Sequence, residues 1–111
     1  METDDIPGRK PDLWIPIGDK IDLALLGKLG EEAAELCGII SRCIIQGVDE
    51  PDPESGKINR ASLQDEIADV MALSSLVQAR FHMSETEIFK RIDRKMKMKY
   101  EWIRMLKEHL S

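Results

Sequence analysis

The fold is decided by residues 62–77, which read SLQDEIADVMALSSLV. At about 100° per residue, the apolar side chains of this stretch cover most of the circumference of a helix. Glu66 and Asp69 point in the same directions as some of those apolar side chains, so both lie on a face suited to burial. An unpaired buried carboxylate is strongly destabilising, which indicates that a partner of opposite charge belongs there.

A second acidic group precedes this stretch by about thirty residues and reads Glu31-Glu32-Ala33-Ala34-Glu35. Glu32 and Glu35 are i, i+3 neighbours on one helix face, as are Glu66 and Asp69. Two such pairs brought face to face would place four carboxylates around one point, where a cation must neutralise them. Because the site has oxygen ligands and no nearby His or Cys, it favours Mg²⁺, with Mn²⁺ as an alternative. A single acidic pair is more often a solvated surface feature, and it is the combination of both pairs that favours a metal site.

The chain is predicted to be all-α, with an extended N-terminal arm over residues 1–18 and one domain over residues 19–111. Prolines and glycines exclude a helix from the arm. The first helix is expected from Asp19, its N-cap, to about Gln46, and the second from about residue 59–62 to 81. A third begins at the capping box Ser84-Glu85-Thr86-Glu87 and continues to about His109.

Three helices of this kind leave one flank of the second helix uncovered. Because that helix is apolar over most of its surface, we expect a helical bundle of three main helices that oligomerisation completes to four-helix packing. The sequence therefore predicts a homodimer, or a tetramer built from dimers.

Composition narrows the class of protein further. The 111 residues carry a formal net charge of −5, which argues against a general nucleic-acid binder. No apolar run approaches the roughly 20 residues that span a bilayer, so we expect no membrane association. Cys37 and Cys43 form no disulfide framework or thiolate metal site, which is typical of a reduced, cytoplasmic protein.

The third helix is basic, and two of its lysines interrupt an otherwise apolar pattern. Lys95 and Lys99 are i, i+4 neighbours, and Lys99 stands where the seven-residue apolar spacing would place another apolar side chain. They are either a snorkelling pair on a solvated face or two ammonium groups directed at phosphate oxygens near the metal.

The order Glu-Glu-x-x-Glu, then Glu-x-x-Asp, over about residues 20–105 resembles the MazG-like members of the all-α nucleoside triphosphate pyrophosphohydrolases. The resemblance implies a Mg²⁺-dependent enzyme that hydrolyses a nucleoside triphosphate to a monophosphate and pyrophosphate. Carried over by position, it implies the following metal ligands: Glu32, Glu35, Glu66 and Asp69.

The resemblance also implies a supporting role for Glu31 and a phosphate contact for Lys95, whereas Lys99 stands where some relatives carry Asn. A carboxylate beside the metal can activate water, and we expect Glu35 to do so. A phosphoribosyl-ATP pyrophosphohydrolase-like enzyme is an alternative within this class. A non-catalytic helical module that binds a partner protein is an alternative outside it.

Overall fold

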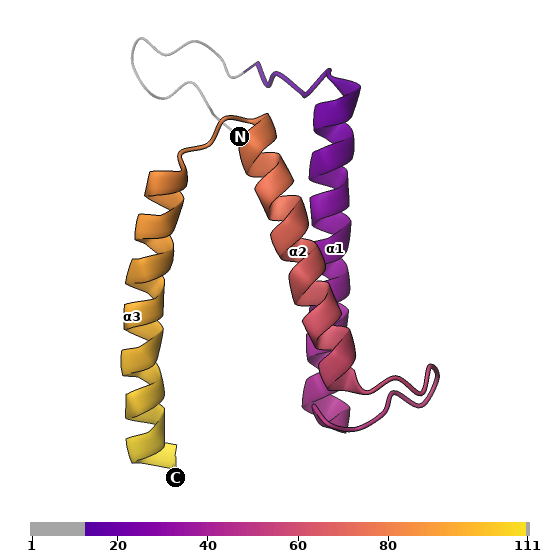
Figure 1. The fold of residues 1–111 in the computed structure, drawn as a ribbon, viewed down its shortest axis with the longest axis vertical. Helices are drawn as coiled ribbons and strands as arrows, with labels where there is room; N and C mark the ends of the chain where they lie inside the picture. The colour runs from indigo at the N-terminus through magenta and orange to yellow at the C-terminus, as the bar shows by residue number, and fades with distance from the viewer. Residues whose placement is uncertain (1–12, 111) are drawn as a thin grey trace.

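The computed structural model describes residues 13–110, and these form three helices (Figure 1). Helix α1 spans Lys20–Gln46, α2 spans Asn59–Arg80 and α3 spans Glu85–Leu110. No strand forms within this part of the chain, so the all-α prediction is confirmed. Residues 13–18 of the predicted arm are neither helix nor strand, and the rest of the arm lies outside the described residues.

The predicted capping residues set the helix ends. The Asp19 carboxylate accepts hydrogen bonds from the N–H groups of Ile21 and Asp22, at 2.9 and 3.0 Å. Gly47 ends α1 with a φ of 110°, a conformation that a side chain would strain. At the start of α3, Ser84 Oγ accepts from the Glu87 N–H at 3.2 Å.

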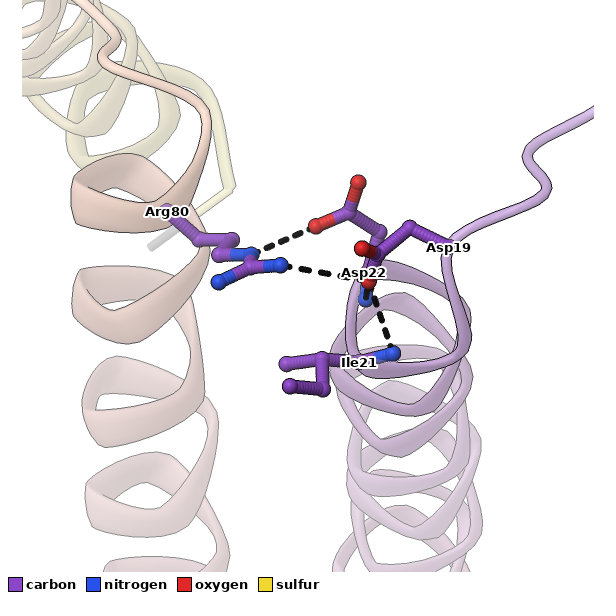
Figure 2. Close-up of polar contacts among 4 residues, drawn as sticks. All are labelled: Asp19, Ile21, Asp22 and Arg80. Atoms are coloured by element: carbon purple, nitrogen blue, oxygen red, sulfur yellow. Dashed lines mark hydrogen bonds and ion pairs between the residues drawn. The ribbon is translucent and has the colours of Figure 1, made fainter.

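Helices α1 and α2 form an antiparallel pair, fastened at one end by Arg80 (Figure 2). Its guanidinium donates to Asp22 Oδ1 at 2.5 Å and to the capping residue Asp19 at 3.1 Å. One side chain thus joins the last turn of α2 to the first turn of α1. Since these groups are partly exposed to solvent, the ion pairs contribute little to stability, and their main effect is to orient the helix ends.

The other end of the pair is fastened by Asn59, which is only 1% exposed. Its Nδ2 donates to Gln46 Oε1 at 2.9 Å and to the Gly47 carbonyl at 3.0 Å. Asp52, in the loop between the helices, is also buried and accepts from the N–H and Oγ of Ser55, both at 3.2 Å. The loop therefore folds back onto the helix ends.

The interface between α1 and α2 buries little apolar surface. Ile39 and Val77 are the only apolar residues among residues 13–110 that are buried. On α1, Ile39 is buried against α2, whereas the neighbouring apolar residues Ile40 and Ile44 are exposed. The radius of gyration is 19.7 Å, against about 13 Å for a compact domain of this length.

Helix α3 stands apart from α1 on the other side of α2 (Figure 1). Its apolar side chains, among them Phe89, Ile92 and Ile103, remain largely exposed. The three predicted helices are present, and within a single chain only α1 and α2 pack closely together. None of the helices in residues 13–110 combines the length and apolarity needed to cross a bilayer.

Replacing Asn59 by Ala should destabilise the fold. The change leaves the oxygens of Gln46 and Gly47 without their donor at a buried position, which costs about 1–3 kcal/mol. Urea unfolding followed by circular dichroism measures this loss. Gln64→Ala, at an exposed position of the same helix, is the matched control and should unfold like the unaltered protein. Equal stability of the Asn59 and Gln64 variants would contradict this account of the loop.

Candidate metal centre

The centre of the α1–α2 interface holds two carboxyl groups in place of an apolar core. Glu32 of α1 is 8% exposed and Glu66 of α2 is 7% exposed. Half-buried apolar residues lie one turn before and after each of them: Leu29 and Leu36 on α1, Leu63 and Val70 on α2. The same amphipathic pattern that pairs the helices therefore carries both carboxyl groups into the interface.

Glu35 joins these two groups from the exposed flank of α1. One carboxylate oxygen from each of Glu32, Glu35 and Glu66 lies within 4.8 Å of the others. Glu32 Oε2 and Glu66 Oε1 are buried and have no hydrogen-bond partner. Buried polar atoms are almost always satisfied, so this pair of oxygens points to a group supplied from outside the chain.

The three carboxyl groups alter one another's protonation. Interaction with the neighbouring carboxyl group of Glu32, together with burial and the charges of Glu32, Glu35 and Asp69, raises the pKa of Glu66 to about 7. The interaction with Glu66, assisted by the nearby Lys28 ammonium, lowers the pKa of Glu32 against the opposing effect of burial. Below about pH 7 and without a cation, Glu66 therefore carries a proton that a divalent ion would displace.

Lys28 is a member of this site that the predicted residue set omits. Its Nζ lies 3.4 Å from Glu31 Oε1 and 3.6 Å from Glu32 Oε1. The i, i+4 spacing of Lys28 and Glu32 is the sequence signal that would have identified it. One half-exposed ammonium cannot neutralise three carboxylates, so Lys28 does not replace a divalent cation.

The other predicted site residues lie outside the cluster of Glu32, Glu35 and Glu66. Asp69 is exposed and outside the three-residue cluster, although its charge acts on Glu66. Glu31 is exposed and paired with Lys28. Lys95 and Lys99 lie on α3, where Lys99 Nζ sits 5.3 Å from the centre of the Trp102 ring. No ion pair within residues 13–110 joins either lysine to the carboxylates.

The donor set fits a hard divalent cation. It consists of carboxylate oxygens alone, and oxygen ligands suit Mg²⁺ or Mn²⁺ better than Zn²⁺. Glu32, Glu35 and Glu66 can supply ligands directly, and the exposed side of Glu35 leaves room for water or a phosphate oxygen. Such a site is open on one side, as a site that binds a substrate through its metal must be.

Comparison of the chain with models of protein families, with curated proteins and with solved structures found no significant match. The interpretation of this centre therefore depends on its own geometry and chemistry.

The stability of the metal-free protein should fall as the pH rises from about 5 to 8. Glu66 has a raised pKa in the folded state, so its proton stabilises the fold below its ordinary value of 4.5, and this contribution is lost as the pH approaches 7. Thermal unfolding in EDTA measures the slope. Glu66→Gln should flatten it, because the amide does not titrate. Saturating Mg²⁺ should also remove the slope, since it binds the deprotonated form. An unchanged slope in Glu66→Gln would contradict the assignment.

Proposed function

We propose that the protein is a Mg²⁺-dependent nucleoside triphosphate pyrophosphohydrolase. The observation that carries the proposal is the pair of buried, unpartnered carboxylate oxygens of Glu32 and Glu66, with Glu35 within 4.8 Å. A helix pair maintained only for stability would place apolar side chains at these two positions, because buried carboxylates cost free energy unless a cation neutralises them. The order of acidic residues along the chain, which resembles that of the MazG-like enzymes, supports the same reaction.

The reaction consists of cleavage of the bond between the α and β phosphates by water. When bound, Mg²⁺ would neutralise the triphosphate and stabilise the charge that develops on the leaving pyrophosphate. Glu35 is exposed beside the two buried carboxyl groups, so it can accept the proton of the attacking water. Glu31 holds the Lys28 ammonium at 3.4 Å and has the supporting role.

Positive charge near the carboxylates comes from α1 itself and, in the oligomer, from α3. Lys28 is already paired with Glu32, and its half-exposed ammonium can contact phosphate once a cation neutralises that carboxylate. Lys95 and Lys99 are exposed on α3 and can contribute phosphate contacts to the site when chains associate. Asp69 lies on α2 one turn from Glu66 and can complete the ligand set after a change of side-chain rotamer.

The oligomer is proposed on separate grounds. Only two apolar residues within residues 13–110 are buried, while more than twenty large ones are exposed on all three helices and on residues 13–17. Exposed apolar surface of this extent marks a protein–protein interface. A second chain that packs against α2 and α3 would complete a four-helix arrangement, so we propose a homodimer or a tetramer built from dimers.

Glu66→Gln should abolish the proposed activity without unfolding the protein. Loss of a residue that only orients a metal ligand already costs about 10- to 100-fold, so loss of a ligand should lower kcat/KM by more than about 100-fold. The assay is Mg²⁺-dependent release of pyrophosphate from a panel of ribo- and deoxynucleoside triphosphates, with phosphoribosyl-ATP included.

The matched control is Asp65→Asn, which removes a carboxylate next to Glu66 in the same helix. Asp65 is exposed and pairs with Lys57 at 2.6 Å, so this variant should keep nearly full activity. Full activity in Glu66→Gln would refute the site. If no member of the panel yields pyrophosphate and Mg²⁺ with nucleotide leaves the melting temperature unchanged, the non-catalytic helical module is the better description.

Sedimentation at micromolar concentration should show a dimer or tetramer. A specific interface of at least about 1,000 Å² is needed for a stable assembly, and α3 together with the outer face of α2 provides the apolar side chains for it. Ile103→Lys, on the apolar face of α3, should shift the protein toward monomer, whereas Lys97→Ala on its charged face should not. A folded, stable monomer of the unaltered chain would contradict the proposal.

A further inference from the structure

The segment Leu13-Trp14-Ile15-Pro16-Ile17 is an exposed apolar strip in front of α1, hereafter the apolar strip. Trp14 is 84% exposed and Ile15 is 93% exposed. Pro16 prevents this segment from joining α1 and biases Ile15 toward an extended conformation. A Trp side chain alone can bury about 150–250 Å², so leaving this strip in water forgoes a large stabilising contribution.

A groove of about 420 Å³ lies between α2 and the start of α3, hereafter the α2–α3 groove. Its apolar lining comes from both helices: Val70, Met71, Ile88, Phe89 and Ile92. Its polar lining consists of uncharged groups, among them Gln78, whose Nε2 donates to Ser74 Oγ at 3.1 Å. The groove therefore suits an uncharged apolar ligand that also has backbone groups to satisfy.

The strip and the groove match in length and in charge. Five extended residues span about 13 Å from the first to the last Cα. The groove follows α2 from Val70 to Gln78, a rise of about 12 Å. Neither the apolar strip nor the groove lining contains Asp, Glu, Lys or Arg, whereas the exposed faces of all three helices do.

The strip of the same chain does not fill this groove. Its C-terminal end is fixed at Asp19, which pairs with Arg80 on the side of α2 that faces α1 (Figure 2). The residues of α2 that are buried against α1 include Val77, and Gln78 points about 100° away from Val77 around the helix. The groove thus opens on the flank of α2 next to the side that faces α1, and the structure leaves the strip of its own chain in solvent.

We infer that the apolar strip of one chain docks in the α2–α3 groove of a second copy. Because each copy offers one strip and one groove, a reciprocal exchange closes a two-fold dimer. This inference adds a specific contact to the oligomer proposed above and does not depend on hydrolytic activity. It also gives Trp14 a role in assembly and separates that role from the carboxylate site.

A disulfide between two different chains tests the exchange. In a Cys37→Ala, Cys43→Ala background, one chain carries Ile15→Cys and another, lengthened by a tag, carries Phe89→Cys. Both positions are exposed within a single chain, so neither change removes internal packing. After refolding as a mixture and mild oxidation, a non-reducing gel should show a disulfide-linked pair of unequal chains, since the Cα atoms must approach within about 7 Å.

The control replaces Phe89→Cys by Ile45→Cys, an exposed apolar position far along α1 from the strip, and should give little cross-linked product. A second readout is the fluorescence of Trp14 in a Trp102→Phe chain, which should be shifted to shorter wavelength and protected from quenching. Ile92→Lys should reverse both effects.

Three results would overturn the inference. One is a cross-link confined within a single chain that carries both Ile15→Cys and Phe89→Cys. Another is an oligomer in which Trp14 stays exposed and no heterodisulfide forms, which would leave the four-helix proposal standing. A protein that sediments as a monomer would remove the exchange and the oligomer together, whatever its activity.

Discussion

The structure depends on one unfavourable contact: two carboxyl groups, Glu32 and Glu66, meet in the interface that holds α1 and α2 together. Like charges at this distance cannot both ionise in a buried place without a cation, and the pKa of Glu66 near 7 reflects that constraint. The interface around them is correspondingly poor in apolar contacts. The helix pair therefore gives up part of its packing to keep an acidic site at its centre.

Because the α1–α2 interface buries few apolar side chains, a single chain leaves most of its large apolar side chains in water. Helix α3 contributes almost nothing to the packing of α1 and α2. Helix α3 is basic, whereas the exposed residues Glu31 and Glu35 of α1 are acidic, and such opposite charges suit association of chains. In the proposed assembly, the acidic pair of helices would bind the metal and α3 would join the chains, so the two tasks would fall to separate parts of one short polypeptide.

Much of the fold could be predicted because the signals are local. Asp19, Gly47 and Ser84 mark helix ends through their own chemistry, and the observed ends agree to within about one residue. The burial of Glu66 followed from its apolar neighbours. The exposure of Asp69 did not, because its direction relative to α1 depends on how the two helices are rotated about their axes.

Two further features of the structure could not be predicted from the sequence, because they also depend on how the two helices pack. Ile39 is buried and Ile40 is not, because the rotation of α1 about its axis decides which of its apolar side chains meets α2. Lys28 enters the site through a pairing that sequence spacing permits but does not require. The apolar strip can be recognised directly in the sequence. The α2–α3 groove cannot, because it forms only where the two helices meet.

The two fastenings of the helix pair, Arg80 at one end and Asn59 at the other, have an effect beyond stability. They fix the axial register of α1 against α2 at points about 10–20 Å from the carboxylates. A slip of one turn would move Glu32 past Glu66 by about 5.4 Å, too far for both to hold one ion. If the central site binds a cation as proposed, its affinity would therefore be set partly by two side chains that do not contact the ion, Arg80 and Asn59.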